Sequence, residues 1–310
     1  MILMKRMSRV RTVPAAVIAA LVALTSCAAP ATTDGASSPS TLHVAVAFYP
    51  FAFVAQRVGG ADVRVENLTA PGAEPHDLEL TPRQVAGLAT ADLVVFQSGF
   101  QPAIDAAIPQ ASPKRTVDSA SFLTLLAATD SDGRAGSAKD PHTWLAPSNL
   151  VMVTEHVRDA LIEARPAASQ TFTANAATLI GELTALDTEF RTGLATCAIR
   201  PFVTSHAAFG YLAHAYNLEQ IAVRGLEPDT EPTAARIAEV QRLATANHVT
   251  TIFFETLVSP VVSQSIAADL GLVTDVLDPI EGITADSRGT DYLEVMGSNL
   301  TALRKANQCS

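Results

Sequence analysis

Three histidines in this chain lie in settings that can hold an imidazole in place. His76 and His142 lie in residues 71–82 and 140–147, two segments that proline makes stiff, and His206 directly follows a predicted strand. Divalent metals of borderline softness favour imidazole nitrogens with one carboxylate oxygen, at about 2.0 to 2.2 Å in a tetrahedron. The three side chains indicate such a site, although their spacing alone equally fits three unrelated loop histidines.

A tetrahedral site of this kind needs a carboxylate, and two acidic residues end predicted strands. Asp278 follows the strand at 272–277, and Glu255 follows the strand at 250–254. Either carboxylate could be the fourth ligand, and Glu255 could instead accept an imidazole N–H behind the metal.

Short β-rich runs alternate with longer helical ones, which is typical of an α/β fold with mostly parallel sheets flanked by helices. Strands are predicted at 42–48, 63–68, 93–96, 115–117, 201–204, 250–254 and 272–277. Helices are predicted at 51–58, 81–91, from Ser148 as cap, and at 168–196, 261–270 and 291–306. In such sheets ligands bind beyond the carboxyl ends of the strands, where His76 and His206 are expected.

The organisation predicted from this pattern is two β/α lobes, at residues 41–165 and 198–310, joined by one long helix within 166–197. At 1.5 Å per residue that helix is roughly 40 Å long, which suits a rigid strut between lobes. Residues 128–139 are polar and contain two glycines, so we expect an exposed loop there.

The first 26 residues are typical of an export signal, with four basic residues before an apolar run that is short for a membrane span. The run ends directly before Cys27 in a pattern that resembles the lipobox of bacterial lipoproteins. We therefore expect residues 1–26 to be removed, Cys27 to carry a lipid and residues 27–40 to form a flexible tether. An ordinary signal peptide with an incidental cysteine is the alternative.

Two further cysteines, Cys197 and Cys309, are expected to form a disulfide in an exported protein, although two buried thiols remain the alternative. The chain is 48% apolar and 17% charged, which excludes disorder over most of its length. Its net charge of -10 argues against a nucleic-acid partner and is tolerable for a cation binder.

The histidine motifs resemble those of the zinc and manganese substrate-binding proteins of bacterial ABC importers. The matching runs are Glu-Pro-His-Asp-Leu-Glu around His76, Asp-Pro-His-Thr-Trp-Leu around His142, and Ser-His-Ala-Ala-Phe-Gly-Tyr around His206. The resemblance covers nearly the whole mature chain and implies two lobes joined by one long helix, with the metal in the cleft. It also implies an acidic fourth ligand after the last strand of the second lobe. Asp278 matches that position and is therefore the first choice, with Glu255 as the second.

Zinc is favoured over manganese, because the third ligand is His206, where manganese members more often have glutamate, and imidazole suits zinc better. Pro75 offers no carboxylate before His76, and residues 128–139 lack the histidine-rich run of many zinc members. We expect a monomeric, lipid-anchored receptor, not an enzyme, that delivers Zn²⁺ to an importer's permease and ATPase. The alternatives are a Mn²⁺ or Fe²⁺ receptor, a zinc hydrolase with Glu255 as base, and an adhesin.

Overall fold

The computed structural model describes residues 41–129 and 135–310. The predicted signal peptide at 1–26, the predicted lipidation site Cys27 and the predicted tether at 27–40 lie outside these residues. None of the helices in the described ranges has the length and apolar character that crossing a bilayer requires.

The first sheet is entirely parallel and has the strand order β2-β1-β3-β4. Its strands are β1 (Leu42–Val46), β2 (Val63–Asn67), β3 (Leu93–Phe96) and β4 (Thr116–Asp118). Helices α1 (Tyr49–Gly59), α2 (Pro82–Thr90) and α3 (Pro102–Ala111) connect them. All four side chains of β3 are buried, so this strand has an uninterrupted apolar sequence.

The second sheet repeats this arrangement, with the order β10-β9-β7-β8 and parallel pairing throughout. Its strands are β7 (Pro201–Thr204), β8 (Glu219–Ala222), β9 (Thr251–Phe254) and β10 (Val273–Val276). Helices α6 (Gly210–Tyr216), α7 (Ala234–Ala246) and α8 (Val261–Leu270) connect them. The predicted α/β fold with two parallel sheets is confirmed.

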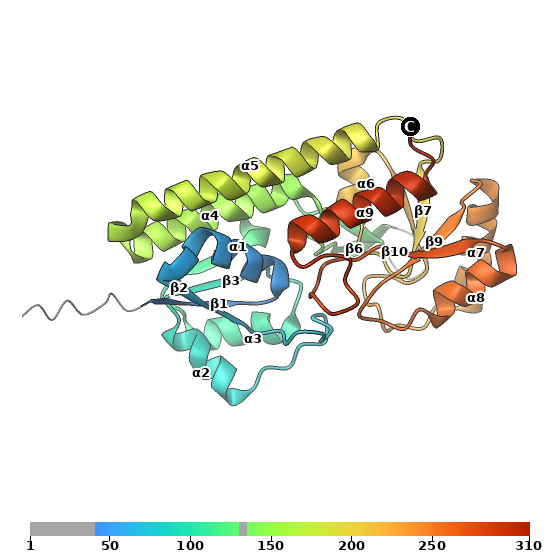
Figure 1. Cartoon of the computed structure of the whole chain (residues 1–310). Coiled ribbons are helices and arrows are strands. Elements are labelled where there is room, and N and C mark those ends of the chain that lie inside the picture. The colour runs from blue at the N-terminus through green and yellow to red at the C-terminus, as the bar shows by residue number, and fades with distance from the viewer. Residues whose placement is uncertain (1–40, 130–134) are drawn as a thin grey trace, which may run out of the picture. The chain divides into compact units, whose positions relative to one another are not determined.

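Three further helices lie along the molecule: α4 (Pro147–Ala164), α5 (Ser169–Gly193) and α9 (Tyr292–Ala306). Figure 1 shows α4 and α5 side by side, with α5 continuing toward the second sheet and α9 below it. The 25 residues of α5 span about 37 Å, and its buried side chains recur at helical spacing from Phe172 to Phe190. The long helix expected at 168–196 is therefore present.

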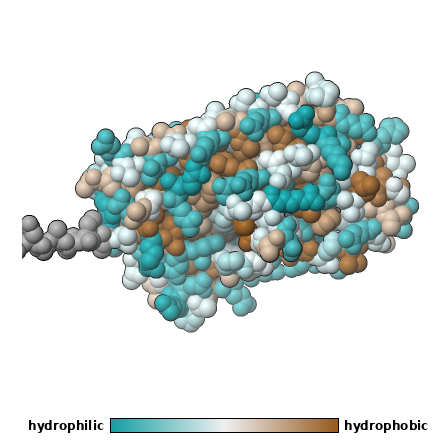
Figure 2. All heavy atoms as spheres, viewed as in Figure 1, coloured by the Kyte–Doolittle hydropathy of each residue, from teal (hydrophilic) through white to brown (hydrophobic). Residues whose placement is uncertain are grey.

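One cluster of buried apolar side chains is shared by the two sheets and the long helices. It includes Val46 and Val95 of the first sheet, Leu183 of α5, and Phe202 and Phe253 of the second sheet. A smaller cluster lies under α7 and α8. On the face in Figure 2, apolar residues are interspersed among polar ones, as on ordinary protein surfaces.

The structure differs from the sequence prediction at 128–139. Strands β5 (Ala127–Thr129) and β6 (Ala135–Lys139) form a two-stranded antiparallel ladder there. The ladder continues through a hydrogen bond from the Asp140 amide to the Leu126 carbonyl, so it leads directly to the His142 segment. Helix α3, strand β8 and helix α7 were not predicted. In α3, several alanines and the internal Pro109 obscure the helical period.

The expected disulfide between Cys197 and Cys309 is present, and it joins positions 112 residues apart. It ties the segment after α5 to the end of α9. Backbone hydrogen bonds from Ala198 to Gln308 and from Ile199 to Asn307 support the same junction.

Candidate metal centre

Four buried side chains converge on one point between the carboxyl ends of the two sheets: His76, His142, His206 and Glu281. The Nε2 atom of His142 lies 3.3 Å from those of His76 and His206. The Oε1 atom of Glu281 lies 3.3, 3.4 and 3.8 Å from the Nε2 atoms of His142, His76 and His206. A tetrahedron with metal–ligand bonds of 2.0 to 2.1 Å has edges of about 3.3 to 3.4 Å. Four of these five distances fall in that range, and the fifth, from Glu281 to His206, is longer at 3.8 Å.

The carboxylate in this cluster belongs to Glu281, and the prediction that Asp278 is the fourth ligand is not supported by the structure. The carboxylate of Asp278 instead accepts hydrogen bonds from the Ile280 amide at 2.8 Å and from the hydroxyls of Ser287 and Thr256 at 3.1 and 3.2 Å. These bonds shape the turn that leads into Glu281. Asp278 therefore orders the loop, and Glu281 reaches the histidines.

The turn between the two acidic residues has an unusual backbone. Ile280 has φ of 58°, a left-handed conformation that is costly for a β-branched residue, and its side chain is fully buried. Asn299 of α9 fixes the start of the turn through bonds to both the amide and the carbonyl of Asp278. Sequence patterns do not report such a reversal. The resemblance points to Asp278 because this residue directly follows the last predicted strand.

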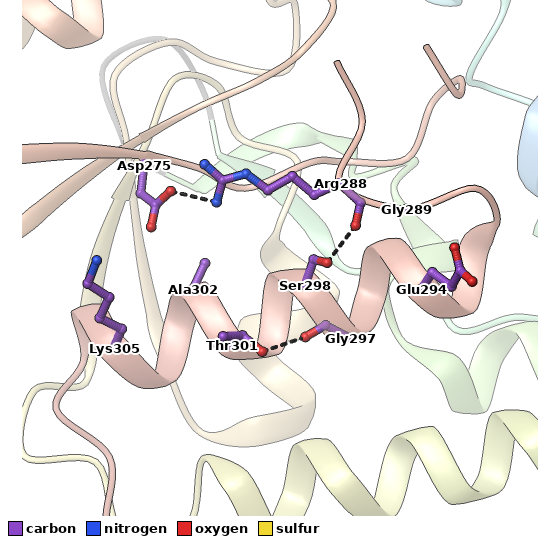
Figure 3. A pocket seen from close by; sticks show the side chains of 9 residues that line it. All are labelled: Asp275, Arg288, Gly289, Glu294, Gly297, Ser298, Thr301, Ala302 and Lys305. Atoms are coloured by element: carbon purple, nitrogen blue, oxygen red, sulfur yellow. Dashed lines mark hydrogen bonds and ion pairs between the residues drawn. The ribbon is translucent and has the colours of Figure 1, made fainter. Parts of the chain in front are cut away.

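The segment that follows Glu281 is anchored at its far end beside α9, where a pocket of about 610 Å³ lies (Figure 3). The Arg288 guanidinium pairs with Asp275 of β10 at 2.6 Å, and the Ser298 hydroxyl donates to the Arg288 carbonyl at 2.5 Å. Both ends of the segment that carries Glu281 are therefore held by the second sheet and α9.

Carboxylates also hold two of the imidazoles from behind. The Nδ1 atom of His142 lies 2.8 Å from Asp140, and that of His206 lies 2.7 Å from Glu255. Glu255 thus occupies the second of its two expected roles. The role of Asp140 was not predicted, although its position two residues before His142 was a usable signal. These contacts place both Nε2 atoms toward the metal position.

Polar side chains in the segment between β3 and α3 fix the two segments that carry His76 and His142. Gln101 donates to the carbonyl of Pro75 at 3.0 Å, directly before His76. Gln97 donates to the Pro141 carbonyl at 2.5 Å, directly before His142. The ring of Phe100 stands edge-on to His76, with centroids 4.8 Å apart. These contacts hold the two segments in place, in agreement with the stiffness predicted from their prolines.

Hydrogen bonds also join the loops of the first sheet to those of the second. The indole of Trp144 donates to the Pro279 carbonyl at 2.7 Å, and Tyr292 of α9 donates to the Trp144 carbonyl at 2.6 Å. The hydroxyl of Tyr211 donates to the Asp140 carbonyl at 2.9 Å. Ligands from both sheets are thus held in one bonded framework.

The electrostatics of the cluster favour a cation. Burial would raise the pKa of Glu281, but the neighbouring His142 and His76 outweigh it and hold that pKa well below its usual range. Burial would lower the pKa of His142, but Asp140 and Glu281 raise it to about 10. Apart from the imidazoles of the cluster, no donor among the described residues reaches either oxygen of Glu281. A buried carboxylate whose polar neighbours are imidazoles suits direct contact with a metal ion.

Gly210 lies against Asp140, because a Cβ atom at this position would be 2.4 Å from Asp140 Oδ2. Replacing Gly210 with alanine is expected to displace that carboxylate from His142. Metal affinity should fall about 10- to 100-fold, as it does when such partners are lost. Competition with a chelator measures the change. Gly181→Ala is the control, since a Cβ there meets nothing within 4 Å. Equal affinities in the two variants would contradict a positioning role for Asp140.

Comparison with known proteins gives consistent matches. The model of the family described as "Zinc-uptake complex component A periplasmic" matches residues 44–306. The zinc-binding lipoprotein AdcA of Streptococcus pneumoniae is 34% identical over 277 residues, which cover 85% of this chain and 55% of AdcA. The high-affinity zinc uptake system protein ZnuA of Bacillus subtilis is 30% identical over 308 residues, 93% of this chain and 95% of that protein.

Solved structures match over 86% of the chain. The Zn(II)-bound ZnuA-like domain of Streptococcus pneumoniae AdcA has a TM-score of 0.73 at 34% identity, with 99% of that domain covered. The laminin-binding protein Lmb of Streptococcus agalactiae, described as bifunctional with adhesin and metal-transporting activity, has a TM-score of 0.77 at 28% identity and is also 99% covered.

Proposed function

The chain belongs to the family of the periplasmic zinc-uptake component A, and we propose on that basis that it is an extracytoplasmic receptor that captures Zn²⁺ for an ABC-type importer. The observation that carries the proposal is the tetrahedral spacing of three imidazole nitrogens and the Glu281 carboxylate. The chain spans about half the length of the first curated relatives it matches. The activity of those longer proteins is therefore a guide to this chain only in the shared region.

Zinc is the metal that this ligand set suits best, because three imidazoles with one carboxylate match a borderline ion better than the harder Mn²⁺. A Mn²⁺ or Fe²⁺ receptor is the alternative. Metal analysis of the full chain purified without added metal, followed by competition among the three ions, tests the proposal. Preferential retention of zinc supports it, and preferential retention of manganese or iron overturns it.

The remaining parts of the proposal concern location and partners. Cys27 would carry a lipid that anchors the chain to the outer face of the cytoplasmic membrane. The partners would be a membrane permease and its ATPase, with the receptor acting as a monomer. The lobes would comprise residues 41–165 and 198–310, joined by the helix within 166–197, so that zinc bridges them.

The number of protein ligands favours a binding protein over a zinc hydrolase. Four protein ligands leave no open position for the water that a hydrolytic zinc requires, and Glu255, the base of that alternative, is bonded to His206. An adhesin remains compatible with the similarity to Lmb. Binding of immobilised laminin by the zinc-loaded chain would test that second activity.

Zinc binding is expected to release a proton near neutral pH. With a pKa raised to about 10, His142 is protonated in the metal-free protein, whereas the metal requires its neutral ring. Affinity should therefore rise as pH increases toward that pKa, by about tenfold per pH unit for one proton. Calorimetry in two buffers of different ionisation enthalpy measures the released proton. A binding enthalpy that does not depend on the buffer would contradict this linkage.

A further inference from the structure

The three imidazoles of the metal centre differ in the contacts of their Nδ1 atoms, which point away from the metal position. His142 and His206 each face a carboxylate at hydrogen-bond distance, and both carboxylates are almost fully buried. In the described part of the chain, Nδ1 of His76 makes no such bond. Its nearest carboxylate is that of Glu227, at 3.8 Å. One of the three ligands is therefore less firmly fixed than the other two.

Glu227 differs from Asp140 and Glu255 in position and exposure. Its side chain is 62% exposed, and it lies in the segment after β8 of the second sheet, whereas His76 follows β2 of the first. Asp140 precedes His142 in the same segment, and Glu255 ends a strand of the sheet that carries His206. Of the three carboxylate–imidazole contacts, the Glu227–His76 contact therefore differs in two ways. Its carboxylate is exposed to solvent, and its two residues follow strands of different sheets.

We propose that Glu227 is the positioning residue of His76, and that zinc enters and leaves the centre past this pair. Closing the gap by about 1 Å would give a hydrogen bond of normal length from His76 Nδ1 to Glu227. That bond would fix the ring as Asp140 and Glu255 fix the others. Because its acceptor is exposed, it is the outer contact that opens most readily. The inference rests on the proposed zinc-receptor function.

A different role for Glu227 must be separated from this one. Asp229 and Glu231 are exposed in the same segment, and three carboxylates together attract cations from a distance. Attraction raises the association rate, weakens with salt and depends little on which carboxylate is removed. A bond to His76 instead slows dissociation, and of these three carboxylates only that of Glu227 lies within 4 Å of His76. The two roles therefore predict changes in different rate constants.

The test compares Glu227→Ala, Glu227→Gln and the matched control Glu231→Ala in the full chain. Zinc association and chelator-induced dissociation are followed by stopped flow at low and high salt, and thermal unfolding of each metal-free variant checks folding. We expect Glu227→Ala to speed dissociation about tenfold. Glu227→Gln, which keeps an acceptor oxygen, should have a smaller effect. Glu231→Ala should change only the association rate, and only at low salt.

Two results would overturn the inference. Equal dissociation rates in Glu227→Ala and Glu231→Ala would show that Glu227 acts by charge alone. Faster dissociation in Glu231→Ala than in Glu227→Ala would assign the positioning role elsewhere in the segment. A wild-type chain that fails to bind zinc would instead overturn the proposed function itself, together with this inference.

Discussion

Replacing Glu281 with glutamine is expected to lower zinc affinity by more than about a hundredfold. That loss exceeds the roughly 10- to 100-fold loss that follows when a residue hydrogen-bonded to a metal ligand is removed. The change removes the one anionic ligand of the cluster while keeping the shape of the side chain. It also removes a charge that helps to raise the pKa of His142 to about 10. A lower pKa of His142 offsets part of the loss, because the neutral ring that the metal requires is then easier to form. Competition titrations against a chelator of known affinity, at fixed pH, measure the loss.

Asp278→Asn is the matched comparison, because Asp278 is the acidic residue that the sequence favoured. Asparagine keeps one oxygen that can accept from the Ile280 amide, so the turn should survive and the affinity should fall less than tenfold. If Asp278→Asn weakened zinc binding more than Glu281→Gln, the result would identify Asp278, and not Glu281, as the fourth ligand.

Removing the disulfide is expected to destabilise the fold while leaving the metal centre largely unchanged. The Cys197–Cys309 bond closes a loop with a sequence separation of 112, and the chain-entropy model assigns about 4 to 5 kcal/mol to a loop of roughly that length. The double variant Cys197→Ser and Cys309→Ser should therefore unfold at a lower denaturant concentration. Zinc affinity of the folded fraction should change only a few-fold, because His206, the ligand that is nearest to the bond in sequence, is nine residues from Cys197 and is held by its own contact with Glu255.

Denaturant titrations with and without saturating zinc separate these effects. Bound zinc should raise the midpoint of the wild type and of the double variant by similar amounts. A double variant as stable as the wild type would show that the backbone bonds between residues 197–199 and 307–309 are enough to hold the junction. Loss of zinc binding at denaturant concentrations where the variant stays folded would show that the junction also orders the centre.

Much of the architecture follows from local sequence patterns. The strands Leu93–Phe96 and Pro201–Thr204 and the helix Val261–Leu270 have the predicted bounds. Continuous apolar runs between polar or turn-forming residues mark the two strands clearly. The three histidines could also be assigned: His76 and His206 each lie in a loop after a strand of a parallel sheet, and His142 lies in a short segment between two prolines.

The parts that sequence did not predict depend on contacts between distant segments. The left-handed Ile280 places Glu281, not Asp278, against the histidines, and no periodicity reports a single backbone reversal. The roles of Asp140 and Gly210 arise from the packing of α6 against the His142 segment. The β5–β6 ladder was missed because its polar, glycine-containing sequence also fits an exposed loop.

Trp144 is the only tryptophan in the chain, and it lies where the two halves of the centre meet. Its ring centroid is 5.2 Å from that of His142, and its indole N–H bonds to a carbonyl two residues before Glu281. Indole emission responds to nearby charge and to the hydrogen bond of its N–H. The protein therefore contains its own optical reporter: its fluorescence should follow occupancy of the site in real time, without an added dye or label.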